Sequence, residues 1–125
     1  MARVVHFEIA ADDPERAVRF YSQAFGWFVE KWQGPEEYWT VSTGEEDEMG
    51  INGAIMRRPQ TLVDGGTINT IGVGDLDEAV AAVVEAGGEV VQERRTIPHV
   101  GIHAYCRDTE GNVFGLLQPD MEARP

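Results

Sequence analysis

The chain opens with apolar and polar side chains in alternation, which predicts a β-strand over residues 4–10. This two-residue period is typical of a strand with one buried face. The apolar face carries Val5, Phe7 and Ile9, and the other face carries His6 and Glu8. The Asp-Asp-Pro sequence that follows predicts a helix start, because Asp caps the first turn and Pro fits it. Apolar residues then recur at helical spacing until Gly26, where the helix is expected to end.

Three further strands are expected before the pattern begins again. They cover residues 27–32, 38–43 and 51–57. The second half then predicts a strand over 67–73, a helix that begins at Asp75 and stops at Gly87 and Gly88, and three more strands. These last strands cover residues 89–95, 101–107 and 112–118. The order strand, helix and three strands therefore occurs twice along the chain.

A constant offset of 62 residues relates the two halves, since Asp75 repeats Asp13. The same offset maps Ile9 onto Ile71, Ala17 onto Ala79, Val18 onto Val80, Gly26 onto Gly88 and Gly53 onto Gly115. A shared order of elements with one offset predicts a single domain over residues 1–125 built from two βαβββ modules. Module one covers residues 1–58 and module two residues 67–120; a linker over 59–66 joins them, and a tail over 121–125 follows.

The composition limits the kinds of partner and the cellular compartment that we expect for this protein. The net charge of −12 argues against nucleic acid, whose binding depends on Lys and Arg at the phosphates. A single cysteine, Cys106, cannot form an internal disulfide, and we expect it to be a buried, inert thiol. No apolar run approaches the roughly 20 residues that cross a bilayer, and no signal peptide is recognised at the start. We therefore expect a cytoplasmic protein with no membrane partner.

Three stretches resemble the vicinal oxygen chelate superfamily, which includes glyoxalase I, fosfomycin-resistance enzymes, bleomycin-binding proteins and extradiol dioxygenases. The stretches are residues 5–26, residues 73–88 and residues 108–115, where Asp-Thr-Glu-Gly-Asn stands for the common Asp-Pro-Asp-Gly-Asn. The likeness spans nearly the whole chain and implies the α+β fold of that family. In this fold two βαβββ modules form curled mixed half-barrel sheets around a central cavity, with helices on the outer face. Such motifs specify the fold and leave the reaction open.

This fold assigns a side to each strand residue. It implies that the helices cover Val5, Phe7, Ile9, Ile71 and Val73. It also implies that the cavity receives His6, Glu8, Ile68 and Thr70. In the third and seventh strands, Tyr38, Thr40, His103 and Tyr105 are expected to face inward.

The resemblance also supplies four positions at which metal-dependent members carry ligands, on the first and last strands of each module. Here these positions hold His6, Gly53, Ile68 and Gly115. One possible ligand is too few, since catalytic sites generally supply about three. We therefore expect no metal and no cofactor. A set of His6, Glu8 and His103 is the alternative with suitable chemistry. The glycines are expected either to leave room for an organic ligand or to permit sheet curvature.

Glu8 and His6 are the candidate catalytic pair, because a partly enclosed carboxylate beside an imidazole suits acid–base work. Both also have a structural interpretation, as a paired carboxylate and a hydrogen-bonded histidine. The candidate ligand-binding residues are Tyr38, Thr40, Gly53, Thr70, His103, Tyr105 and Gly115.

Three functions are compatible with the sequence. The first is binding of a small organic molecule without the usual divalent metal, as in the bleomycin-resistance relatives. The second is a metal-independent lyase or isomerase that uses Glu8 and His6. The third is a glyoxalase-like or dioxygenase-like metalloenzyme with atypical ligands. The resemblance further implies a homodimer.

Overall fold

The computed structural model describes residues 2–59, 66–120 and 122, and it contains the predicted order of elements. The first half comprises β1 (Arg3–Ala11), α1 (Pro14–Phe25), β2 (Phe28–Lys31), β3 (Tyr38–Ser42) and β4 (Gly53–Arg57). The second half comprises β5 (Thr67–Gly72), α2 (Leu76–Glu85), β6 (Glu89–Ile97), β7 (Gly101–Arg107) and β8 (Val113–Pro119). The predicted α+β fold with two βαβββ repeats is confirmed. Most of the predicted linker and tail lies outside the described residues.

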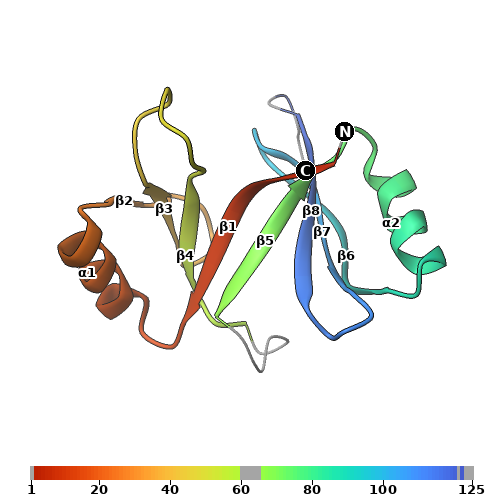
Figure 1. The fold of residues 1–125 in the computed structure, drawn as a ribbon, viewed down its shortest axis with the longest axis horizontal. Helices are drawn as coiled ribbons and strands as arrows, with labels where there is room; N and C mark the ends of the chain where they lie inside the picture. The colour runs from red at the N-terminus through yellow and green to blue at the C-terminus, as the bar shows by residue number, and fades with distance from the viewer. Residues whose placement is uncertain (1, 60–65, 121, 123–125) are drawn as a thin grey trace. The chain divides into compact units, whose positions relative to one another are not determined.

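The chain divides into two compact units (Figure 1). The N-terminal unit is His6–Ile68, and the C-terminal unit is Met1–Val5 with Asn69–Pro125. No helix in the described part of the chain is long and apolar enough to span a membrane.

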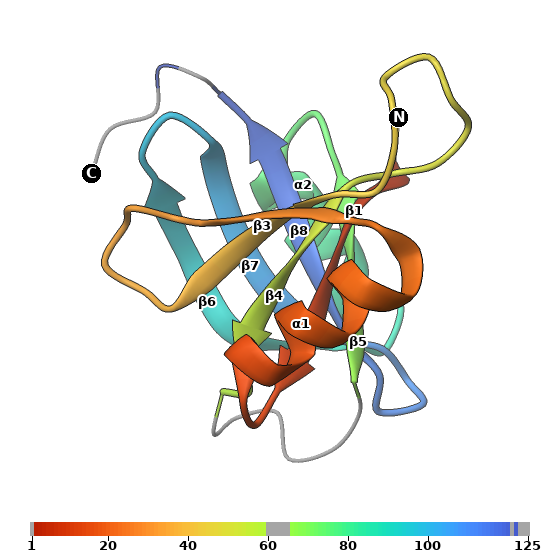
Figure 2. The same ribbon diagram turned by 90° about the vertical axis from the view of Figure 1, so that its left-hand side faces the viewer.

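In the N-terminal unit the strands follow the order β2-β3-β4-β1. The β2–β3 and β3–β4 pairs are antiparallel, whereas β1 and β4 are parallel. Figure 2 shows α1 in front of these strands, on one face of the sheet. Strand alternation therefore divides the side chains into a helix-covered face and an opposite face.

Helix α1 begins and ends as the sequence predicts. The Asp13 side chain accepts a hydrogen bond from the Arg16 backbone N–H at 3.1 Å, and Gly26 ends the helix in the left-handed conformation with φ 71°. Beneath the helix lies an apolar cluster of Ala11, Trp39, Val41 and Ile55, against which Ile9, Ala17, Val18, Tyr21, Trp27 and Val29 pack.

The C-terminal unit repeats this plan with the order β6-β7-β8-β5. Again the last strand, β8, is parallel to the first, β5. Helix α2 covers a cluster of Leu76, Ala104, Cys106 and Leu116, with Ile71 and Val73 packed against it. Cys106 is fully buried there, as expected, and burial raises the pKa of its thiol. Val5, which was expected under a helix, is instead 41% exposed.

The two halves correspond by an offset that changes along the chain. Asp13 and Asp75 both cap helices, so the offset of 62 holds there. Just after the helices it is one residue shorter, because the left-handed glycine that follows each helix is Gly26 in one half and Gly87 in the other. In the last strands, Ala54 pairs with Glu8, and Gly115 pairs with Thr70. The counterpart of Gly115 is therefore Ala54, and the expected match to Gly53 was wrong by one residue.

This shift places Gly53 on the helix-covered face, in register with Phe7. A Cβ at Gly53 would lie 2.5 Å from the Phe7 carbonyl oxygen and 2.6 Å from two Phe7 ring atoms. The expectation that Gly53 leaves room for a ligand is thereby corrected: Phe7 occupies that space, and glycine permits its close approach.

We predict that Gly53→Ala destabilises the protein by about 1–3 kcal/mol, because backbone atoms cannot move aside cheaply. Chemical denaturation measures this loss. Gly74→Ala is the matched control, since a Cβ there meets nothing within 4 Å in the described structure. Equal stability of the two variants would contradict the placement of Phe7 over Gly53.

Candidate functional site

A hydrogen-bonded chain of three side chains lies on the face of the N-terminal sheet opposite α1. The Tyr38 hydroxyl donates to Glu8 Oε2 at 2.8 Å, and His6 Nε2 lies 2.9 Å from the same hydroxyl oxygen. Glu8 is only 5% exposed. The structure therefore brings together both candidate catalytic residues and one candidate binding residue through Tyr38.

The positions of the hydrogen atoms in this series of hydrogen bonds follow from the number of protons that each group can donate. A tyrosine hydroxyl has one hydrogen, and here it points to the carboxylate. The Tyr38 oxygen must then accept from His6, so the imidazole carries hydrogen on Nε2. Burial lowers the pKa of His6 below the ordinary 6.5, and the nearby Glu8 charge opposes this shift by raising it. The imidazole is thus neutral at pH 7.

The sheet register accounts for this meeting of distant residues. Glu8 pairs with Ala54, which pairs with Thr40 on the next strand. Tyr38 lies two residues from Thr40 and hence on the same face. Its long side chain reaches diagonally across the small Ala54 toward β1. Thr40 is exposed, and its hydroxyl donates to the Glu30 carbonyl at 3.3 Å, so it stays outside the chain of hydrogen bonds.

Trp32 supports Tyr38 in a way that the sequence analysis did not predict. The two rings make an edge contact with centroids 5.9 Å apart, and the Trp32 backbone N–H donates to the Tyr38 carbonyl at 2.7 Å. The sequence signal for this contact was the position of Trp32 and Tyr38 at the two ends of an expected hairpin turn. The effect of the contact is to limit the orientations open to the Tyr38 ring.

A second cluster of candidate residues lies in the C-terminal unit. Thr70, His103 and Tyr105 are 2%, 5% and 9% exposed, and the His103 and Tyr105 rings contact edge to face at 4.4 Å. A Cβ at Gly115 would lie 2.9 Å from His103 Nε2 and 3.2 Å from Thr70 Oγ1. The space beside Gly115 is therefore filled by these two side chains, and the glycine makes their close packing possible.

Strand register shows that the two clusters occupy equivalent places. Tyr38 corresponds to His103, and Thr40 to Tyr105, because their partners on the last strands correspond. Glu8 corresponds in the same way to Thr70. The N-terminal cluster contains the carboxylate of Glu8, whereas Thr70, His103 and Tyr105 supply hydroxyl and imidazole groups at the equivalent places.

The residues at the expected metal positions do not fit a divalent metal. With the corrected register these positions are His6, Ala54, Ile68 and Gly115, of which only His6 has a donor atom. In the N-terminal unit, Tyr38 also engages the Nε2 atom of that histidine. Within the described ranges no group of three His, Cys, Asp or Glu side chains is placed to hold a metal ion.

The family of this chain is defined by sequence. The model of the Glyoxalase/Bleomycin resistance protein/Dioxygenase superfamily matches residues 3–116, and the chain belongs to this superfamily. It is 30% identical over 116 residues to a "Glyoxylase-like domain-containing protein" from Didymella fabae, covering 87% of this chain and 88% of that protein.

Two further comparisons bear on length and fold. A "Putative glyoxylase CFP32" from Mycobacterium tuberculosis is 28% identical over 114 residues; the match covers 90% of this chain but only 42% of that protein. Among solved structures, a methylmalonyl-CoA epimerase in complex with methylmalonyl-CoA and NH4+ superposes with a TM-score of 0.69 at 17% identity. That match covers 100% of this chain and 99% of the epimerase, and it shows the shared fold.

The lowered His6 pKa predicts a pH dependence of stability. The unfolded chain binds a proton near pH 6.5 and the folded chain only at lower pH, so the unfolded state holds more protons between these values. Stability is therefore full above about pH 6.5 and falls as the pH drops toward the folded pKa, by about 1.4 kcal/mol for each unit of depression.

His6→Gln keeps a side-chain N–H but cannot titrate, so we expect it to flatten this pH dependence. Thermal unfolding between pH 5 and 7 measures the slope. His99→Asn is the control, because His99 is exposed and Asn tolerates its positive φ of 64°. An unchanged slope in His6→Gln would show that His6 is not held in the neutral form.

Proposed function

We propose that this protein binds a small, oxygen-bearing organic molecule at the Glu8–Tyr38–His6 chain without the divalent metal typical of its superfamily. The observation that carries this proposal is the Tyr38 hydroxyl between Glu8 and His6, at 2.8 and 2.9 Å. Ligand-binding sites combine a largely buried surface with a few directed polar groups, and a buried carboxylate with ordered partners has that character.

The donor and acceptor pattern indicates how such a ligand would be held. The neutral imidazole, protonated on Nε2, has its Nδ1 lone pair as an acceptor. The Glu8 carboxylate accepts hydrogen bonds and carries negative charge. Both groups favour hydroxyl or N–H groups on the ligand over a second carboxylate, which Glu8 would repel. A hydroxylated, uncharged face is therefore the ligand surface that we propose contacts this cluster.

The absence of suitable ligands at three of four expected positions supports metal-independent binding. Ala54, Ile68 and Gly115 offer no side-chain donor. In the C-terminal unit, Thr70, His103 and Tyr105 supply hydroxyl and imidazole groups at the matching places. We propose these three as ligand-binding residues of the C-terminal unit, taken by itself.

Protein purified without chelator tests the proposal directly. Mass spectrometry identifies bound organic molecules, and elemental analysis measures Ni, Zn and Fe. We expect a retained organic compound and much less than one metal ion per chain. Stoichiometric metal would instead support the metalloenzyme alternative.

The recovered compound then allows a test of individual residues. We expect Tyr38→Phe and Glu8→Gln to weaken its binding by roughly tenfold or more, since the first removes a hydrogen bond to a charged group and the second removes the charge. Calorimetric titration measures the dissociation constants, and circular dichroism checks folding. Tyr21→Phe is the control, because Tyr21 stacks on Trp27 on the helix-covered side. Equal weakening in all three variants would argue against this site.

A catalytic role is favoured by one specific observation. The hydrogen bonds from His6 through Tyr38 to Glu8 form a continuous path for a proton. A proton taken from the bound molecule by His6 Nδ1 could be balanced by passage of the Nε2 proton through Tyr38 to Glu8, so His6 and Glu8 as an acid–base pair would suit a metal-independent lyase or isomerase reaction. Conversion of the recovered compound by wild-type protein, and its loss in Glu8→Gln, would support this second function.

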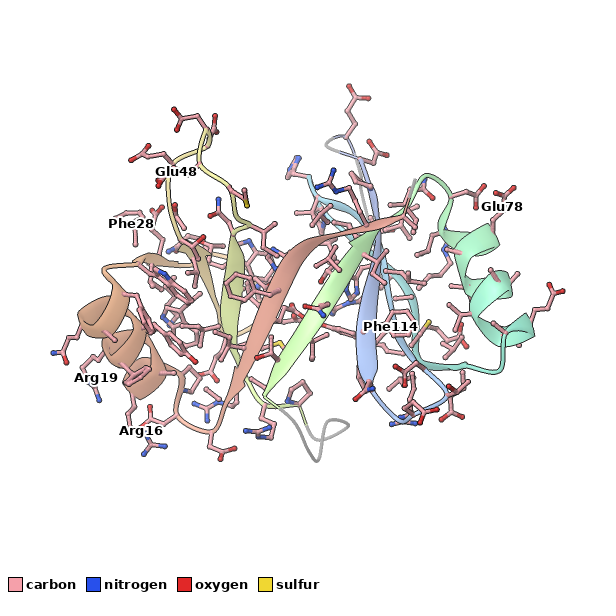
Figure 3. All side chains as sticks on the ribbon, in the orientation of Figure 1. Arg16, Arg19, Phe28, Glu48, Glu78 and Phe114 are labelled. Carbon is pink, nitrogen blue, oxygen red and sulfur yellow. The ribbon has the colours of Figure 1, made fainter. Side chains whose placement is uncertain are left out.

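We also propose that the protein forms a homodimer. Phe20, Phe25 and Phe28 on α1 and β2 are 57%, 63% and 63% exposed, and Figure 3 shows Phe28 extending from β2. Exposed apolar residues gathered in one region are typical of interaction surfaces.

Light scattering coupled to chromatography should therefore give twice the chain mass of 13.8 kDa. The double substitution Phe20→Ser and Phe28→Ser should weaken association at least about tenfold, because it removes two large apolar contacts. Val84→Ser, on α2 at 54% exposure, is the control. A monomer at all concentrations would rule out this surface as a dimer interface.

A further inference from the structure

We infer that a second binding site lies on the helix-covered side of the N-terminal unit and takes a small organic monoanion with a flat apolar body. A pocket of about 390 Å³ lies there, lined by Glu15, Val18, Arg19, Lys31 and Trp39. Its size is within the range of small-molecule sites. It does not depend on the function proposed for the Tyr38 cluster.

The sheet separates this pocket from that cluster. Trp39 and Tyr38 are neighbours on β3, so their side chains point to opposite faces. Trp39 packs with Val41 and Ile55 under α1, whereas Tyr38 contacts Glu8 and His6. A ligand beside Trp39 therefore has no access to the Glu8 carboxylate through the sheet.

The charges in the pocket select an anion. The chain has 22 acidic and 10 basic residues, and ion pairs engage Arg57, Arg58, Arg94 and Arg107. By contrast, Arg19 and Lys31 have no carboxylate within salt-bridge distance among the described side chains. Arg19 and Lys31 thus line one pocket of a strongly acidic protein, and the carboxylate on which the Lys31 charge acts, Glu37, is itself paired with Arg57.

Glu15 limits the charge of the ligand. One carboxylate against two cations leaves a local charge of about +1, which favours a monoanion over phosphate or a polyanion. The apolar wall comes from Val18 and Trp39, and the Lys31 ammonium lies 5.6 Å from the Trp39 ring centroid. A carboxylate or sulfonate paired with Lys31 and Arg19 would hold its ring against that wall.

The probe for this site is 1-naphthoate, followed through the Trp39 indole N–H and the Val18 amide in ¹H–¹⁵N correlation spectra. We expect saturable shifts at both groups. The uncharged 1-naphthalenemethanol should bind at least about threefold more weakly, because it lacks the charge that Arg19 and Lys31 recognise. Inorganic phosphate should not shift Trp39.

Variants distinguish a specific binding site from general attraction of the 1-naphthoate anion to positive charge. Arg19→Gln and Lys31→Gln should each raise the dissociation constant of 1-naphthoate at least about threefold. Arg16→Gln is the matched control, because Arg16 lies on α1 near Arg19 but does not line the pocket (Figure 3). Tyr38→Phe should leave 1-naphthoate binding unchanged, so this test can fail independently of the proposed function. Linear, unsaturated shifts, or equal losses in Arg16→Gln and Arg19→Gln, would overturn the inference.

Discussion

Burial of the Glu8 carboxylate is the constraint on which the N-terminal site depends. A charged group removed from water is tolerated only when hydrogen bonds or opposite charges replace its hydration. The Tyr38 hydroxyl supplies one such bond at 2.8 Å, and in doing so it uses its single hydrogen. His6 must then present a hydrogen to Tyr38, which fixes its tautomer and agrees with the lowered pKa. The buried carboxylate thus fixes the tautomer of His6 through Tyr38, whereas burial of the imidazole keeps it neutral.

The sequence predicted local features well and long-range register less well. Asp caps, glycine stops and strand alternation depend on neighbouring residues, so the element order and both helix-covered faces could be predicted. Gly53 was wrongly matched to Gly115 because a constant offset of 62 residues takes no account of the shorter second helix. The bond between Tyr38 and Glu8 depends on how β3, β4 and β1 align, which involves residues 30 positions apart. The sequence predicted that Glu8 and Tyr38 face the same side of the sheet, but it did not predict that they form a hydrogen bond with each other.

The two units use the same strand positions for different chemistry. In the N-terminal unit the positions hold a carboxylate and a phenol, whereas the C-terminal unit has Thr70 and His103 there. Gly115 and Ala54 stand at the equivalent position of the last strand in their units, beside Thr70 and Glu8 respectively. A Cβ at Gly115 would approach His103 Nε2 to 2.9 Å, so the packing of His103 in the C-terminal unit requires the glycine.

Packing under α1 and hydrogen bonding on the other face are linked through β3. A shift of this strand by one residue would turn Trp39 toward Glu8 and Tyr38 toward the apolar cluster. The carboxylate would lose a donor, and a phenolic ring would replace the indole that packs against Val41 and Ile55. Trp39 opposes the shift because its large apolar surface is buried only in the observed register. The residue that forms the wall of the anion pocket thus also holds Tyr38 in position, so the packing of one face sets the chemistry of the other.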